Sequence, residues 1–230
     1  MLDASDAAPP PEPDVCSLRG TAAPILAELR ARFHVSKLVA SGLPTGLPAF
    51  EDWLGSWPRP GLTEVTGAPG AGRLAPLLPA LRDLQTRGER VLLVDAAGNV
   101  QVRALPGLEN VLVVRAGLAR AAWVAEQAAR SGALAAVVLV DAPPLGSRVG
   151  VRLGRAAEAG HCTVFVVGER PEPAVGFACR VQVEGWGPPT AEGVDVLRVH
   201  CGHHRRGRGG ERRAVVLDAC EGVQARWVAA

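Results

Sequence analysis

The sequence comprises 230 residues, of which 48% are hydrophobic, and carries a formal net charge of +2. This hydrophobic content is enough for one domain with a sizeable core and an appendage. The small net charge excludes a strong overall attraction to nucleic acid, so any basic surface must be local. The five cysteines form no C-x-x-C pair, and no apolar run approaches the ~20 residues of a membrane span. We therefore expect a cytoplasmic protein with free thiols and no membrane contact.

The amino-terminal part predicts a disordered tail followed by a helix. Residues 1–17 are acidic and rich in proline, and they lack the basic and apolar segments of a signal peptide. Residues 18–37 contain an apolar stripe at helical spacing, which either packs on the core or docks on a partner or on a second copy of the chain. The stripe is formed by Ile25, Leu26, Leu29 and Phe33. We assign the remaining residues, 38–230, to one core domain.

From residue 62 onward, apolar runs alternate with helical patterns. Runs that are apolar at every position are typical of strands covered on both faces, and their alternation with helices indicates right-handed crossovers. We predict an α/β fold with a central, mostly parallel sheet flanked by helices, and antiparallel strands beyond residue 180. The predicted strands are 62–66, 91–95, 111–114, 136–141, 163–167, 180–183, 194–200, 214–217 and 223–228. The predicted helices are 76–87, 118–131 and 148–159, with one further turn around 50–54.

A glycine-rich loop, Gly67-Ala-Pro-Gly-Ala-Gly-Arg73-Leu74, connects the first strand to the first of these helices. Its glycines match the phosphate-loop pattern G-x-x-x-x-G-K-[ST], in which the lysine contacts the β- and γ-phosphates and the hydroxyl holds Mg²⁺. Arg73 stands in place of the lysine. Leu74 replaces the hydroxyl residue and removes a magnesium ligand, because this ion requires oxygen. Pro76 and Pro79 are expected to displace or kink the start of the helix.

The order of these segments resembles the core of the RecA-like superfamily. The similarity rests on the lead-in Ser41-Gly-Leu-Pro-Thr-Gly46 with Phe50-Glu-Asp-Trp-Leu54, on residues 87–97 and on residues 131–141. It covers about residues 38–220 and implies a RecA-like fold. The two loops that bind DNA in recombinases would be short here.

The same resemblance implies a site without catalytic chemistry. It makes Asp141 the Walker B aspartate, puts Ala97 at the position of the general-base glutamate and brings Glu169 near the polar sensor. Loss of the lysine, the hydroxyl and the base together is incompatible with ordinary ATP hydrolysis, so we expect no enzymatic activity. We interpret the site as vestigial and without a cofactor, with weak nucleotide or phosphate binding as the alternative. The site comprises Gly67, Gly70, Gly72, Arg73 and Asp141.

A small RecA-like protein with an altered site is most similar to the ImuA family, whose members are also labelled SulA-like. That family acts with ImuB, a polymerase relative that lacks catalysis, in translesion synthesis during the SOS response. The resemblance implies a non-catalytic adaptor in the DNA damage response, whose partner is an ImuB-like polymerase relative or RecA. Two alternatives stay open. One is a DNA-dependent ATPase or RecA paralogue in recombinational repair, and the other is a SulA-like cell-division inhibitor, against which the retained glycines argue.

An arginine- and glycine-rich segment, residues 203–213, predicts a cationic loop between two strands. Its arginines would contact DNA phosphates without reading sequence, and a solvated hairpin tip is the alternative. The arginines are Arg205, Arg206, Arg208, Arg212 and Arg213. Histidines and a cysteine at 200–204 lie beside them, but neighbours in a strand point to opposite faces, so we predict no metal site.

Overall fold

The computed structural model describes residues 42–101, 105, 107–108, 110–172, 176–187, 196–204, 211–218 and 224–228. The chain divides into two units, Met1–Val39 and Ala40–Ala230. The first unit lies outside the described residues, so the tail (1–17) and the N-terminal helix (18–37) stay predictions. The same holds for the predicted stripe, which consists of Ile25, Leu26, Leu29 and Phe33.

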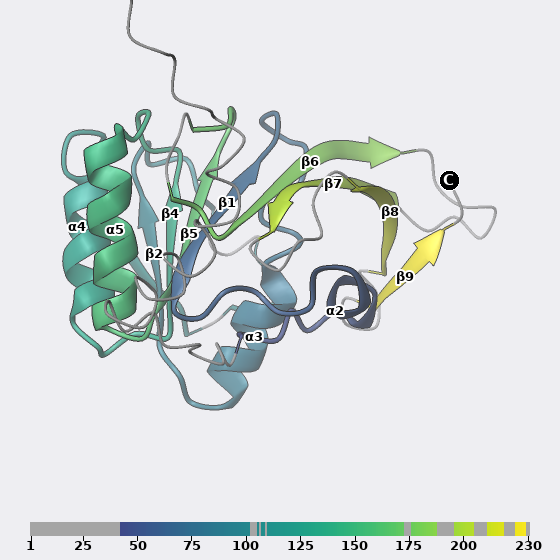
Figure 1. Cartoon of the computed structure of the whole chain (residues 1–230), viewed down its shortest axis with the longest axis horizontal. Coiled ribbons are helices and arrows are strands. Elements are labelled where there is room, and N and C mark those ends of the chain that lie inside the picture. The colour runs from purple at the N-terminus through teal and green to yellow at the C-terminus, as the bar shows by residue number, and fades with distance from the viewer. Residues whose placement is uncertain are drawn as a thin grey trace, which may run out of the picture. The chain divides into compact units, whose positions relative to one another are not determined.

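Nine strands of the described residues form one mixed sheet (Figure 1). They are β1 (Gly61–Thr66), β2 (Val91–Asp95), β3 (Leu112–Arg115), β4 (Ala136–Val140), β5 (Thr163–Gly168), β6 (Cys179–Gly187), β7 (Val196–His204), β8 (Glu211–Asp218) and β9 (Gln224–Val228). Their order is β3-β2-β4-β5-β1-β6-β7-β8-β9. The first six strands in this order pair in parallel, and β7, β8 and β9 pair antiparallel. The predicted fold class is therefore confirmed.

One strand departs from the predicted topology. β6 was expected to begin the antiparallel part, but it runs parallel to β1, with Thr63 opposite Cys179 and Thr66 opposite Gln182. By residue 178 the chain has returned to the start of β1, where the Ala178 amide donates to the Leu62 carbonyl at 2.8 Å, so β6 begins beside the amino-terminal half of β1. Antiparallel pairing consequently begins only at β7.

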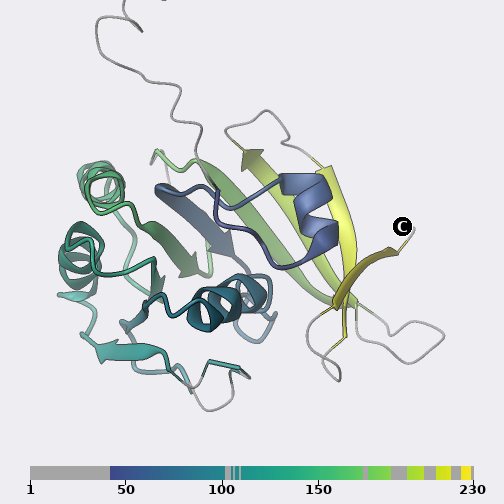
Figure 2. The ribbon, with the colours of Figure 1, turned by 90° about the horizontal axis from the view of Figure 1, so that it is seen from below.

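Helices lie on both faces of the sheet (Figure 2). Helices α2 (Pro48–Leu54) and α3 (Leu78–Thr86) lie on one face, and α4 (Ala121–Arg130) and α5 (Ser147–Ala159) lie on the other. Along β2, Val91 and Leu93 join the core under α2 and α3, whereas Leu92 and Val94 join the core under α4 and α5. Side chains alternate between the two faces along a strand. Because both faces of the central strands are covered by helices, every position needs an apolar residue, and this explains the continuous apolar runs.

The edge strand β3 is the exception to this pattern. All four of its residues are exposed, and Leu112 is 50% accessible. The prediction that every apolar run is covered on both faces is wrong for this strand. Its apolar residues identified it as a strand, but its place at the end of the sheet order decided its exposure, because the helices pack over its neighbours.

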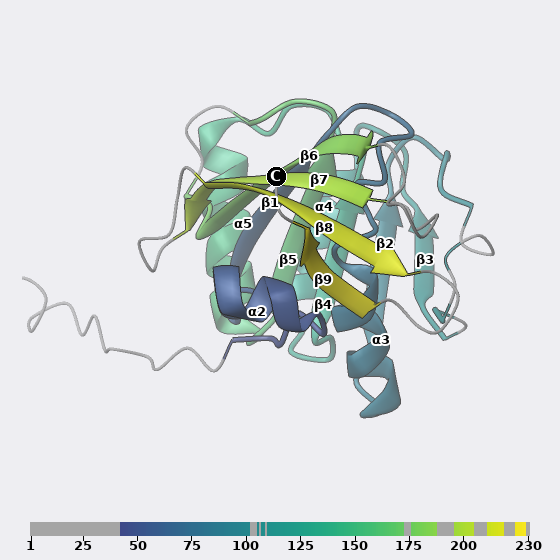
Figure 3. The same ribbon diagram turned by 90° about the vertical axis from the view of Figure 1, so that its right-hand side faces the viewer.

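The antiparallel strands β7 and β8 extend into the segment that was predicted to be an arginine-rich loop. In Figure 3 these strands face the viewer, and α2 lies against β9. β7 extends to His204 and β8 begins at Glu211, so Arg212 and Arg213 are strand residues, paired with His200 and Val199. The predicted loop, residues 203–213, is therefore longer than the observed gap between the two strands, because the strands pair into both of its ends. Three loop arginines lie outside the described residues: Arg205, Arg206 and Arg208.

Within the described part of the chain, no helix is both long enough and apolar enough to span a bilayer.

Candidate functional site

The glycine-rich loop after β1 takes its path from three glycines. The Gly67 amide donates to the Gly168 carbonyl at 3.2 Å and so continues the pairing of β1 with β5. A Cβ at Gly67 would lie 2.6 Å from the carbonyl oxygen of Val183 on β6, a distance that Cβ atoms essentially never show. Gly70 and Gly72 each have a φ of +81°, a conformation that favours glycine. The geometry of the loop thus favours glycine at all three positions, by close approach at Gly67 and by backbone conformation at Gly70 and Gly72.

The helix after this loop begins later than the phosphate-loop pattern implies. The chain first forms turns, and α3 starts at Leu78. Pro76 has no amide hydrogen to donate to the carbonyl of Gly72, which accepts from Ala75 instead, at 2.9 Å. Pro79 then lies in the first turn of α3, where proline is tolerated. The positive end of the helix dipole is therefore displaced along the chain from the loop.

Arg73 and Asp141 form a two-point ion pair between the loop and the end of β4. Nη1 of Arg73 lies 2.7 Å from Oδ1 of Asp141, and Nη2 lies 3.3 Å from Oδ2. Asp141 has a φ of +51°, and its amide donates to the Val167 carbonyl at 2.9 Å. The two side chains are 13% and 26% exposed. Partial burial and the forked geometry both strengthen such a pair relative to one on the open surface.

A cavity of about 850 Å³ lies beside this ion pair. Its charged lining side chains, among the described residues, are those of Arg73, Asp141 and Glu169, so negative charge exceeds positive charge by one. This balance disfavours a polyphosphate that carries no metal ion. Asn99 and Gln101 contribute the amide side chains of the lining. The predicted site residues that line the cavity are Gly70, Gly72, Arg73 and Asp141.

The fold resembles that of a solved structure. The structure described as the RadB recombinase aligns with a TM-score of 0.58 and 17% sequence identity, and the alignment covers 76% of this chain and 96% of that chain. The fold is RecA-like. No protein-family model and no curated protein matches the sequence. The predicted RecA-like fold is thereby confirmed, and at this identity the likeness concerns the fold alone.

The residues at this RecA-like site do not fit a magnesium nucleotide. Leu74 packs against the core under α2 and α3 and offers no oxygen, which a magnesium ion requires. Both carboxylate oxygens of Asp141 accept hydrogen bonds from Arg73. The cation expected to hold a phosphate and the carboxylate expected to hold the metal are thus bonded to each other.

Among the described residues that follow β2, no carboxylate stands at the general-base position. Ala97, at the general-base position of RecA-like ATPases, is exposed and carries only a methyl group. The nearby Asp95 is buried, and its carboxylate accepts the amides of Gly98, Asn99 and Val100 at 2.8, 3.2 and 2.9 Å. Asp95 therefore fixes the loop that follows β2. Its two carboxylate oxygens thus accept three backbone hydrogen bonds, which is the pattern of a residue that orders a loop.

A buried polar cluster, which was not predicted from the sequence, is centred on Glu64 of β1. Glu64 Oε1 accepts the Glu172 amide at 2.6 Å, and Oε2 lies 3.4 Å from Nε of Arg180 on β6. Burial raises the pKa of Glu64 above its ordinary value, although the Glu172 amide and the Arg180 charge oppose this shift. One feature of the sequence could have predicted this cluster, namely the single glutamate in the strand Leu-Thr-Glu-Val-Thr. A charged side chain in a strand that is covered on both faces needs a partner.

Glu172 extends this cluster to a second loop. Its Oε2 accepts the Leu145 amide at 2.7 Å, and its carbonyl accepts a hydrogen bond from Arg180 at 2.9 Å. Burial raises the pKa of Glu172 as well. The Arg180 guanidinium also lies 4.9 Å from the centre of the Phe177 ring. The segments after β4 and β5, which correspond to the shortened DNA-binding loops of the RecA-like resemblance, are therefore joined to each other.

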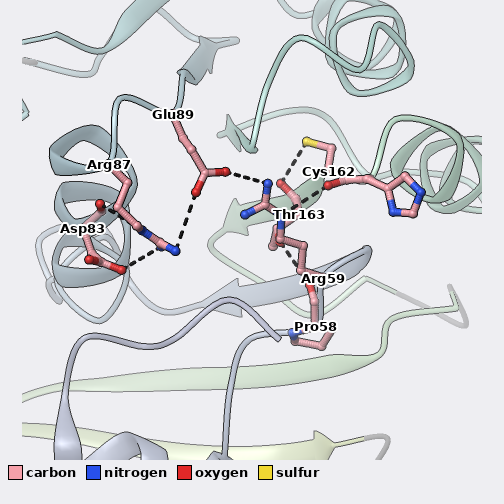
Figure 4. A network of polar contacts seen from close by, with 8 residues as sticks. Pro58, Arg59, Asp83, Arg87, Glu89, Cys162 and Thr163 are labelled. Atoms are coloured by element: carbon pink, nitrogen blue, oxygen red, sulfur yellow. Dashed lines mark hydrogen bonds and ion pairs between the residues drawn. The ribbon is translucent and has the colours of Figure 1, made fainter. Parts of the chain in front are cut away.

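A separate polar network lies at the amino ends of the parallel strands (Figure 4). Arg59 donates to Glu89 at 2.7 Å and to the carbonyl of His161 at 3.2 Å, which ties the segment before β1 to those before β2 and β5. Cys162 is buried beside it, and burial raises the pKa of its thiol to about 12. This thiol is protonated at neutral pH, so it has the character of a core residue and not of a nucleophile.

Proposed function

We propose that this RecA-like protein acts without ATP hydrolysis, as an adaptor in the DNA damage response of the ImuA kind. The observation that carries the proposal is the ion pair between Arg73 and Asp141. In a phosphate-loop ATPase the corresponding cation contacts phosphate and the corresponding carboxylate serves the metal. Here each side chain satisfies the other, and Leu74 supplies no ligand in their place.

The setting in DNA metabolism is supported by the fold comparison. The similar solved structure is described as a recombinase, and a role in repair or recombination is consistent with that description. We propose translesion synthesis as the process, with an ImuB-like polymerase relative or RecA as the protein partner. Association through the apolar stripe of residues 18–37, with this partner or with a second copy of the chain, is part of the proposal.

Nucleotide titration of the purified full-length chain tests the proposal. We expect ATP with Mg²⁺ neither to raise the melting temperature nor to release phosphate above background. The double variant Arg73→Lys, Leu74→Thr restores the phosphate-loop residues, yet turnover should stay at background because Ala97 leaves the attacking water without a base. Phosphate release by the natural chain that disappears in Arg73→Ala would refute the non-catalytic role.

One observation favours a second candidate, an ATPase or RecA paralogue. Glu169 lies at the end of β5 and lines the cavity, so this alternative has a carboxylate for the missing base. It requires Arg73 to leave Asp141 when nucleotide binds. Under this alternative, Glu169→Gln abolishes phosphate release while leaving nucleotide binding intact, whereas under the adaptor proposal the same variant changes neither measurement.

A further inference from the structure

The outer surface of helices α4 and α5 carries a net positive charge. Together with the N-cap residue Arg120, the two helices carry five arginines and two glutamates. This excess of positive charge is larger than the net charge of +2 of the whole chain. We define the α4–α5 basic face as Arg120, Trp123, Arg130, Arg148, Arg152 and Arg155, all of which are exposed.

One buried carboxylate sets the register between the two helices. Glu126 of α4 is 3% exposed, and it accepts hydrogen bonds from Arg130 on its own helix and from Arg152 on α5. Both helices belong to crossovers between parallel strands, so they run in the same direction, and Figure 1 shows them side by side. Residues one turn before Glu126 are consequently level with residues one turn before Arg152.

This register gathers the exposed residues of both helices along their junction. On α4, Arg120, Trp123 and Arg130 recur at spacings of three and seven residues, which keeps them on one side of the helix. On α5, Arg148 and Arg155 lie one turn to either side of Arg152. The two stripes therefore flank the contact between Glu126 and Arg152 and form one continuous surface.

Most of this charge is not neutralised within the described residues. Arg130 and Arg152 share the single carboxylate of Glu126. Arg120, Arg148 and Arg155 make no ion pair among the described residues. Because exposed arginines that lack a protein partner remain free to bind phosphate bidentately, this face suits a polyanion.

An exposed tryptophan distinguishes between the polyanions that such a face could bind. Trp123 is 57% exposed and lies between the arginines of α4. A nucleotide of a single strand offers both a phosphate for an arginine and an unpaired base that stacks on an aromatic ring. An acidic peptide offers only the charge, and a duplex keeps its bases stacked inside. We propose that the α4–α5 basic face binds single-stranded nucleic acid, with arginines on the phosphates and Trp123 against a base.

This surface goes beyond the proposed adaptor role. No residue of the α4–α5 basic face lines the cavity beside Arg73. A variant that no longer binds single-stranded nucleic acid should therefore give the same result in the nucleotide titrations. A variant of the cavity should likewise keep its binding of single-stranded nucleic acid. The residues of the α4–α5 basic face are also different from those of the predicted arginine segment, 203–213.

Fluorescence anisotropy with a labelled oligo-dT strand tests the proposal on the full-length chain. The variant Arg148→Gln, Arg155→Gln removes two arginines that have no ion pair in the described structure, so it should fold normally. We expect roughly tenfold weaker binding at low salt. We also expect the slope of log K against log[salt] to become shallower by about 1.4, because each contact on a single strand contributes about 0.7. The pair Arg148→Lys, Arg155→Lys keeps the charge and should recover most of the slope.

A matched control removes the same charge elsewhere. Arg90 and Arg198 are exposed and form no ion pair among the described residues, and Arg90→Gln, Arg198→Gln should leave binding nearly unchanged. An equal loss of affinity in this control would show that only the net charge of the protein matters, and it would overturn the assignment of binding to the α4–α5 basic face. Repeating both measurements with Arg205, Arg206 and Arg208 changed to glutamine prevents binding by that segment from masking the result.

The tryptophan provides an independent measurement. Trp123→Leu should weaken oligo-dT binding roughly fivefold or more without altering the salt slope, since stacking releases no counterion, and Trp123→Phe should retain most of the affinity. Equal affinity for a duplex of the same length, or competition by polyglutamate as strong as that by unlabelled oligo-dT, would overturn the proposal in favour of a general polyanion or an acidic protein.

Discussion

The guanidinium of Arg73 is held by the carboxylate of Asp141 through two hydrogen bonds, 2.7 and 3.3 Å long. Arg73 occupies the lysine position of the phosphate-loop pattern, and Asp141 is the aspartate that the RecA-like resemblance assigns to the metal. The change from lysine to arginine therefore affects both positions, because a planar forked cation matches both oxygens of a carboxylate with two parallel hydrogen bonds, a geometry that an ammonium does not offer. The first prediction concerns this pair.

Asp141→Asn should release Arg73 into the cavity. Asparagine tolerates the positive φ of residue 141, so the backbone is expected to keep its path, at a cost of about 1–2 kcal/mol for the lost charged hydrogen bonds. We expect pyrophosphate to bind roughly tenfold more tightly than to the natural chain, measured by calorimetry. Glu169→Gln removes one negative charge from the same cavity but leaves the ion pair intact. Equal gains in both variants would show that net charge, and not the release of Arg73, controls the affinity.

The buried carboxyl groups of Glu64 and Glu126 should give opposite pH dependences of stability. Burial raises the pKa of Glu64 above 4.5, so its contribution to the free energy of unfolding is complete below this value and is lost as pH rises through the folded-state pKa. Burial also acts to raise the pKa of Glu126, but hydrogen bonds from Arg152 and Arg130 outweigh it and hold the pKa below 4.5. Its contribution is therefore present above 4.5 and is lost as pH falls.

Urea denaturation across this pH range measures the two effects. Relative to the natural chain, Glu64→Gln should lose less stability as pH rises from 4.5 toward neutrality, and Glu126→Gln should lose less as pH falls below 4.5. Parallel stability curves for Glu64→Gln and the natural chain would show that its ionisation does not differ between the folded and unfolded states.

Gly67→Ala should destabilise the fold by about 1–3 kcal/mol, because the new Cβ would lie 2.6 Å from the Val183 carbonyl oxygen and must push apart β1 and β6. Gly146 provides the comparison, since its φ is −62° and no atom lies within 4 Å of an added Cβ. Gly146→Ala should stay within about 0.5 kcal/mol of the natural chain. Similar melting temperatures for the two variants would contradict the close approach at Gly67.

The predicted N-terminal stripe should mediate association. Leu29→Asp with Phe33→Asp places charges on its apolar side, which should abolish co-purification with an ImuB-like partner and self-association in light scattering. The melting temperature of the core should not change. Ala27→Asp with Ala31→Asp, on the opposite side of the predicted helix, is the matched control and should associate normally. Unfolding of the Leu29 and Phe33 variant would instead make the stripe part of the core.

The arginine segment should contribute sequence-independent, salt-sensitive binding. If all five arginines contact phosphates of a single strand, their share of the slope of log K against log[salt] is roughly −3 to −4, at about 0.7 per contact. Replacing them with alanine should remove this share, and replacing them with lysine should retain it. The arginines are Arg205, Arg206, Arg208, Arg212 and Arg213. Gel shifts that are identical for the natural chain and the alanine variant would exclude a DNA role for the segment.

The sequence by itself determined the elements and most of the fold class. Apolar runs such as Val91–Asp95 are local signals, and so are the glycines at 67, 70 and 72, whose backbone conformation or close contacts favour glycine. The RecA-like fold was predicted from the resemblance of these signals, in their order, to the RecA-like superfamily. Each depends on residues that are near one another in the chain, where period and turn chemistry act directly.

Only the tertiary structure decided which side chains meet. Arg73 and Asp141 are 68 residues apart, and Glu64 and Glu172 are 108 apart, so neither pair leaves a periodic trace in the sequence. The same holds for β3, whose apolar residues are exposed because of its place at the sheet edge. Strand order and crossover direction bring distant segments together, and the resulting burial and pairing determine charge, pKa and the state of the site.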